Sequence, residues 1–359
     1  MSTLTGLIGG GGGGAYQGRT ISFTSSTTYT APANIKGAYV MVIGGGGGGG
    51  LFGRSTSGVG RACGGGGGGV AASYFDLTPS QSYTVSVGGW GGAQLGTGNV
   101  KLNGNAGGTS SFAGSGITTV QATGGGGGAA INESQDGNIV ASGGAGGVGS
   151  GGNLFNYTGG AGGDGAVSAS TGGGGGGACN ILGVSTSLIA GGDHTDAITE
   201  GGGFGAHPCG QNIIEEGANT SVNYFNLADY IGGWQRYNQV RTMKNNSVFG
   251  FVYSEIVRPN IPLSSPSRIQ ENFNYYDGIL INGGSIGSGP RPQIFAEPFC
   301  GSRGIGSDGP GTEYPLDTSM AGIGGGGGGC GFVDPIAGLT VQSVAGGVGI
   351  VHLVEILSA

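Results

Sequence analysis

Charged side chains are scarce in this sequence. Asp, Glu, Lys and Arg together make up 9% of the 359 residues, against roughly 25% in an ordinary soluble domain. The three lysines, Lys36, Lys101 and Lys244, are scattered, and the formal net charge is −7. A nucleic-acid-binding protein would carry a basic patch or stripe. We therefore expect no nucleic-acid partner, and the low charge also disfavours ordinary disorder, which combines high net charge with low hydrophobicity.

Long apolar runs and targeting signals are also missing. No stretch of 18 apolar residues occurs, so no membrane insertion is expected. Residues 1–8 lack the positively charged start of a secretory signal. A chain without such a signal folds in the cytoplasm, where its thiols stay reduced.

The sequence contains no pattern typical of a metal or cofactor site. No two cysteines have C-x-x-C spacing, so neither a zinc site nor a redox motif is predicted. We expect the cysteines to be small buried hydrophobic side chains. The alternative is that some cysteines form contacts after the protein has assembled or has been released from the cell. The five are Cys63, Cys179, Cys209, Cys300 and Cys330.

Catalytic motifs are absent or explained by composition. No lysine follows a glycine run, which excludes a P-loop. Ser285 lies in a G-x-S-x-G pattern, but in a chain with 94 glycines such matches arise by chance. Residues 193–196 have side chains that could bind a metal, with His207 and Cys209 nearby, but the chain has only three histidines and we interpret this segment as a polar loop. Glu215-Glu216 is interpreted as an exposed loop or turn, because no partner acid or base is identifiable. We therefore predict that the protein is not an enzyme.

Glycine is what the sequence has in excess. It contributes 94 of 359 residues, several times the usual share of roughly 7%. No strict Gly-X-Y period is present, so collagen is excluded. The long glycine runs are similar in length, which flexible linkers have no reason to be. They occupy residues 9–14, 44–50, 64–69, 124–128, 172–177 and 324–329.

The runs are predicted to form a bundle of polyproline-II-like segments. Glycine disfavours a helix and gives a strand no side chains to pair. Polyproline II has three residues per turn and no internal hydrogen bonds, so its backbone groups need partners on neighbouring segments. Solvated loops are the alternative. The scaffold glycines expected at the centres of the runs are Gly47, Gly66, Gly126, Gly174 and Gly326.

Strand patterns lie between the runs, so the predicted fold class is mostly β with a glycine-run bundle. Residues 83–87 alternate apolar and polar side chains, as a strand with one buried face does. The other predicted strands are 21–29, 38–43, 70–77 and 349–357.

Composition divides the chain into four parts. Residues 208–300 hold only 10 of the 94 glycines but six of 13 Tyr and six of 13 Phe. We predict an inserted aromatic-rich domain there, with Cys209 and Cys300 close together at its neck, since the ends of an inserted domain lie near each other. The remaining parts are an N-terminal attachment or assembly segment (1–20), a glycine-rich scaffold (21–207), and a return to that scaffold with a closing strand (301–359).

The order of several short motifs resembles a known family. A strand and proline at 29–32 precede an apolar strand that enters a glycine run at 39–50. Further motifs follow in order at 83–89 (YTVSVGG), 107–112 (GGTSSF), 122–128 (ATGGGGG) and 346–351 (GGVGIV). This order is similar to that of the glycine-rich domain of bacteriophage tail fibre and adhesin proteins. The resemblance covers roughly residues 21–207 and 320–359, and it implies a virion protein that assembles in the host cytoplasm as a homo-oligomer, preferably a trimer.

Recognition is the remaining candidate activity. In the insertion, aromatic residues alternate with polar ones, as they do in rigid binding surfaces. The alternative is that these rings form the core of the insertion. The predicted receptor-binding or docking residues are Tyr224, Trp234, Arg236, Tyr237, Tyr275 and Tyr276.

Three functions are compared on this basis. The first is a tail fibre or tail-tip adhesin that binds a protein or polysaccharide receptor on the host surface. The second is a purely structural virion component, such as a head fibre, decoration or collar protein, whose insertion docks to another virion protein. The third, a polysaccharide depolymerase, needs two carboxylates about 5–9 Å apart, and no such pair can be identified from the sequence.

Overall fold

A computed structural model shows the fold. The structure describes residues 16–54, 60–132, 141–165, 321–333 and 340–358, with short pieces at 176–177, 179–180, 183, 186, 189–191, 206–207, 211–212, 301 and 305–307. Strands and extended glycine-rich segments make up these residues, and none of them is α-helical. The predicted mostly-β fold class is confirmed. Across the same residues, no helix has the length and hydropathy needed to cross a membrane.

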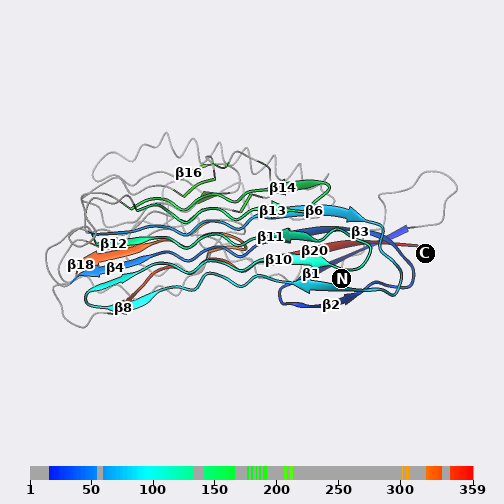
Figure 1. The fold of residues 1–359 in the computed structure, drawn as a ribbon, viewed down its shortest axis with the longest axis horizontal. Helices are drawn as coiled ribbons and strands as arrows, with labels where there is room; N and C mark the ends of the chain where they lie inside the picture. Colours follow the sequence, from blue (N-terminus) through cyan, green and yellow to red (C-terminus); the bar gives the residue numbers. More distant parts are fainter. Residues whose placement is uncertain are drawn as a thin grey trace, which may run out of the picture.

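The strands fall into two sets. The larger strands build two sheets at one end of the molecule, and the short ones lie at the far end or beside the glycine runs (Figure 1). Their bounds are β1 (Tyr16–Phe23), β2 (Thr27–Thr30), β3 (Ile35–Ile43), β4 (Leu51–Arg54), β5 (Gly60–Ala62), β6 (Val70–Phe75), β7 (Ser82–Ser86), β8 (Leu95–Thr97), β9 (Val100–Leu102), β10 (Ser110–Ala113), β11 (Val120–Ala122), β12 (Ala130–Asn132), β13 (Gly149–Ser150), β14 (Phe155–Tyr157), β15 (Ala206–His207), β16 (Gln211–Asn212), β17 (Ile305–Ser307), β18 (Cys330–Val333), β19 (Thr340–Gln342) and β20 (Ile350–Ser358).

Two five-stranded antiparallel sheets form a β-sandwich. One sheet has the order β1-β20-β3-β6-β14 and the other β13-β11-β10-β7-β2. The strands predicted within 38–43, 70–77, 83–87 and 349–357 are confirmed as β3, β6, β7 and β20. The predicted strand 21–29 is divided between β1 and β2, which belong to different sheets.

The sandwich encloses the main hydrophobic core. In β7, Tyr83 and Val85 are buried while Ser82 and Thr84 are exposed, as the alternation predicts. Tyr83 stacks on Phe112 of β10, with 5.3 Å between ring centroids. The other buried residues of this core are Tyr29, Ala31, Ile35, Ala38, Val40, Val42, Ala71, Phe75, Leu77, Val85, Val120, Ala122, Val351 and Leu353.

From the sandwich, the glycine-rich segments extend side by side to the opposite, distal end of the molecule (Figure 1). Strand β3 continues into residues 44–50 and then β4, and the chain returns through β5 and residues 63–69 to β6. The same crossing is repeated along the chain. The sandwich strands β3 and β6 therefore anchor one end of these two runs, and the short strands β4 and β5 mark the other end.

The runs are arranged in three layers. The outer layer consists of consecutive segments that hydrogen-bond to each other in chain order, and the 44–50 and 63–69 runs lie behind it. Residues 324–329 bond to both of those runs and so form part of the third layer. The outer-layer segments are 88–94, 103–109, 123–129, 141–148 and 158–165.

Short strands gather at the distal end. One sheet there has the order β17-β18-β4-β9, and the pairs β12-β5 and β19-β8 lie beside it (Figure 1). The connections 55–59, 98–99, 133–140 and 334–339 each join elements of this end. Segments that are distant in the sequence therefore meet at one end of the bundle.

Candidate functional site

The backbone of run 44–50 is fully enclosed by other runs. All seven residues are buried, and every N–H donates to a carbonyl oxygen of another run at 2.8–3.0 Å. The accepting run changes with each residue and recurs every third residue, which is the period of polyproline II. Gly44, Gly47 and Gly50 donate to Gly69, Gly66 and Cys63; Gly45 and Gly48 donate to Gly108 and Asn105; Gly46 and Gly49 donate to Gly347 and Val344.

Three of the predicted scaffold glycines lie on one line of hydrogen bonds across the layers. Gly47 donates to Gly66 at 2.9 Å, Gly66 donates to Gly126 at 2.9 Å, and Gly126 donates to Ala145 at 2.7 Å. Gly326, in the third layer, donates to Gly177 at 2.7 Å. Each of these four glycines therefore bonds to a neighbouring run; Gly174 lies outside the described residues.

Close approach of the backbones explains why these positions are glycine. A Cβ atom added to Gly47 would lie 1.9 Å from the carbonyl oxygen of Gly126. The corresponding distances are 2.1 Å from Gly66 to the oxygen of Ala145 and 2.0 Å from Gly326 to the oxygen of Gly65. Real Cβ contacts are never this short, so any side chain would push neighbouring backbones apart and break their hydrogen bonds.

In residues 143–148 and 88–91 of the outer layer, side chains stand only at exposed positions. In residues 141–148, burial repeats with a period of three: Gly144 and Gly147 are buried, whereas Ala145 and Val148 are exposed. Run 88–94 follows the same rule, because Gly88 and Gly91 are buried and Trp90 is 51% exposed. The period of the backbone thus determines which positions can hold a side chain.

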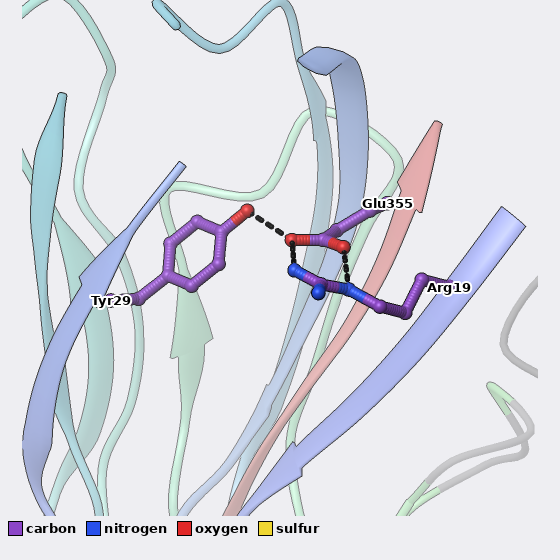
Figure 2. Close-up of polar contacts among 3 residues, drawn as sticks. All are labelled: Arg19, Tyr29 and Glu355. Atoms are coloured by element: carbon purple, nitrogen blue, oxygen red, sulfur yellow. Dashed lines mark hydrogen bonds and ion pairs between the residues drawn. The ribbon is translucent and has the colours of Figure 1, made fainter. Parts of the chain in front are cut away.

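Glu355 of β20 is a charged residue inside the sandwich. Its side chain is 0% exposed, and Figure 2 shows Arg19 of β1 and Tyr29 of β2 converging on it. Arg19 Nη2 donates to Glu355 Oε1 at 2.8 Å, and Arg19 Nε donates to Oε2. Tyr29 Oη donates to Oε1 at 2.5 Å. A buried carboxylate must be paired and hydrogen-bonded, and these two side chains supply both.

The surroundings of Glu355 shift the pKa of both partners upward. Burial raises the pKa of Tyr29, and its hydrogen bond to the carboxylate adds to the effect. The hydrogen bond to Glu355 raises the pKa of Arg19. Tyr29 is therefore neutral and Arg19 charged at any physiological pH. The cluster joins the two sheets, since Tyr29 and Glu355 belong to opposite ones.

Comparison with known families agrees with this geometry. A profile of the glycine-rich domain family matches residues 21–250. The chain belongs to this glycine-rich domain family. No curated protein matches the sequence.

The predicted recognition residues of this glycine-rich domain protein lie outside the described part of the chain. This applies to Cys209 and Cys300 as well, so their proximity stays a prediction. The other three cysteines are buried and pack in hydrophobic clusters, as expected of small apolar side chains. The recognition residues concerned are Tyr224, Trp234, Arg236, Tyr237, Tyr275 and Tyr276.

Sequence reasoning missed two features of this glycine-rich domain. Glu355 lies on the buried face of the apolar strand IVHLVEIL, and a charged residue in such a strand indicates a buried charge. Its partners Arg19 and Tyr29 lie more than 300 residues away in the sequence. Trp90 stands between glycine pairs, and only the period-three arrangement of its run places the ring outward.

Proposed function

We propose that this protein is an attachment component of a bacteriophage virion, most specifically a tail fibre or tail-tip adhesin that binds a host-surface receptor. The observation that carries the proposal is the meeting of short strands at the distal end, namely β4, β5, β8, β9, β12, β18 and β19. Residues 55–59, 98–99, 133–140 and 334–339 join strands held at that end by backbone-to-backbone packing. Loops that connect the elements of a rigid scaffold are common sites of recognition.

The scaffold suits this role because the buried backbone of its central runs is paired with other runs of the bundle. Every N–H group of runs 44–50 and 64–69 donates to a neighbouring run, which holds these runs in fixed positions. The sequence of the connections is then available for receptor specificity. The resemblance to phage adhesins supports the same conclusion, and the aromatic-rich insertion 208–300 adds a second candidate contact surface.

Binding of the purified chain to a panel of bacterial strains tests the proposal. We expect the fluorescently labelled protein to bind strains that the encoding phage infects. Replacing residues 133–140 with a Gly-Ser segment of equal length should weaken binding, as should Trp234→Ala or Tyr237→Ala. Thr118→Glu, which changes an exposed residue at the sandwich end, serves as the control. A protein that binds none of these strains would contradict the adhesin role.

The purely structural role makes a different prediction. A head fibre, decoration or collar protein would bind another virion protein and would not bind cells. Antibody labelling of phage particles viewed by electron microscopy separates the two, because label at the tail tip agrees with the adhesin and label on the capsid or collar contradicts it.

A further inference from the structure

All-glycine runs in this bundle are surrounded on every side. Each N–H of runs 44–50 and 64–69 donates to a neighbouring run, and both runs are wholly buried. The outer-layer runs have no further run on their outer side. There they carry exposed side chains such as Ala106, Ala145 and Ala161. An outward side chain keeps a further backbone from approaching closely, as the Cβ distances within the bundle show.

Residues 124–128 do not follow this rule. Five consecutive glycines lie in the outer layer, where runs 44–50 and 64–69 bond to them from behind and runs 104–108 and 143–148 from the sides. On the outward side Gly124 and Gly127 are half-buried, and within the described part of the chain their N–H groups have no hydrogen-bond partner. We call these two residues the open row. Exposed Ala106 and Ala145 stand on the flanking runs.

The open row suits one more glycine-rich backbone. Its N–H groups are three residues apart, so they repeat at about 9.3 Å along a polyproline II segment. A segment with the same period can accept a hydrogen bond at every third residue. It must lack side chains where it contacts the row, because a Cβ atom added to Gly47, Gly66 or Gly326 would lie about 2 Å from a backbone oxygen of the neighbouring run.

The sequence contains such a segment directly before β1. Residues 9–14 are six consecutive glycines, followed by Ala15 and Tyr16. Six residues of polyproline II extend about 19 Å, enough to cover residues 124–128.

The same chain cannot place this segment on its own open row. Tyr16 pairs with Ser358 and Phe23 with Val351, so Tyr16 lies at the end of the sandwich away from the bundle. The eight residues of β1 separate it from the bundle by roughly 25 Å at the rise of a β-strand. Ala15 alone links Gly14 to Tyr16, and two residues reach at most about 7 Å. The occupant must therefore come from another copy.

We propose that the glycine run 9–14 of one copy docks on the open row of a second copy and links the chains head to tail. The two surfaces differ, so the interface is heterologous and forms a ring if the rotation closes. One run covers a small area, and a closed ring, in which each copy uses both surfaces, gives the most stable form of this contact. The inference concerns association in solution and does not depend on receptor binding.

Sedimentation of the purified full-length chain over a wide concentration range tests the proposal. The wild type should associate. Gly11→Val together with Gly12→Val should abolish association, because valines prevent close approach, and Ala106→Phe with Ala145→Phe should abolish it by blocking the row. The control Ala161→Phe places the same ring at an exposed alanine of a different run and should leave association unchanged. Melting temperatures would show that all variants fold.

Disulfide trapping identifies the contact itself. A chain carrying Gly12→Cys, mixed with a chain carrying Ala106→Cys, should give a disulfide-linked heterodimer after mild oxidation, and wild type mixed with either variant should not. A wild type that is monomeric at every concentration would overturn the proposal. So would an oligomer that survives both sets of substitutions, or a double variant that forms its disulfide only within one chain.

Discussion

At the scale of single residues, glycine is required where a Cβ atom would meet the backbone of a neighbouring run. Gly47 is such a position, since an added Cβ would lie 1.9 Å from the oxygen of Gly126. A neighbour of this kind is backbone, so it cannot rotate away as a flexible side chain could.

Gly47→Val should therefore strongly destabilise the protein. The side chain would separate run 44–50 from run 123–129 and break several hydrogen bonds, each contributing about 1 kcal/mol. We expect a loss of about 3 kcal/mol or more in the free energy of unfolding, measured by denaturant titration. Gly89→Val is the matched control, because nothing lies within 4 Å of a Cβ built there. Equal stability of the two variants would contradict the packing argument.

A second residue-scale prediction concerns Tyr29 at alkaline pH. Its pKa is raised in the folded protein, so the stability it contributes is complete below the unfolded pKa of about 10 and is lost as pH rises further. Wild type should lose up to about 1.4 kcal/mol more per pH unit above that value than Tyr29→Phe does. At neutral pH the variant should be less stable by about 1–3 kcal/mol, since it lacks a hydrogen bond to a charged group.

Chemical denaturation at neutral pH and at several pH values above 10 measures both effects. Tyr39→Phe is the control for general tyrosine ionisation. Parallel stability curves for wild type and Tyr29→Phe above pH 10 would refute the prediction.

At the scale of elements, a run is defined by its period. In residues 143–147, an added Cβ would meet a backbone oxygen within about 2 Å at Gly143, Gly144, Gly146 and Gly147. Ala145 already carries a side chain and is exposed. One position in three is thus open to substitution.

A valine scan along this run should give a stability profile with a period of three. Valine at Gly144 or Gly147 should lower the melting temperature sharply, whereas Ala145→Val should change stability by less than about 0.5 kcal/mol, as exposed surface changes usually do. Thermal melting of each single variant gives the profile. A flat profile would indicate that the run is not held by its neighbours.

The sequence predicted which segments form strands and runs better than it predicted which of them pack together. Strands such as 83–87 could be recognised because alternation along a chain is local information, and the shared length of the glycine runs indicated a bundle. The sequence does not show that Gly47 bonds to Gly66, or that run 44–50 lies behind 123–129. Identical glycines carry no signal of which run packs on which; the order follows from the strands that anchor them.

In the candidate site, too, local features could be predicted from the sequence and contacts between distant segments could not. The need for glycine at residues 47, 66 and 326 could be predicted from backbone chemistry. The outward position of Trp90 could not, because it depends on the rotation of its run. Glu355 could be recognised as a charge in an apolar strand, but its pairing with Arg19 depends on which strands become neighbours.

At the scale of the whole molecule, two kinds of packing hold the protein together. The sandwich buries apolar side chains such as Phe112 and Leu353, whereas the bundle buries peptide groups that bond to each other. Exposing apolar surface raises the heat capacity of unfolding, and exposing peptide groups lowers it.

The heat-capacity change of unfolding should therefore be small for a chain of this length. Ordinary domains show about 12–15 cal/mol/K per residue, a value set by side-chain burial that runs 44–50, 64–69 and 324–329 cannot provide. We expect the whole chain to fall clearly below that range when calorimetric enthalpy is plotted against melting temperature over a series of pH values. The low value comes from the folded bundle. If Gly47→Val releases the runs and leaves the sandwich folded, only the sandwich contributes to the transition. The heat-capacity change per unit of unfolding enthalpy should then be higher than in the wild type. A wild-type value inside the ordinary range would show that apolar burial, not backbone pairing, dominates the stability of the molecule.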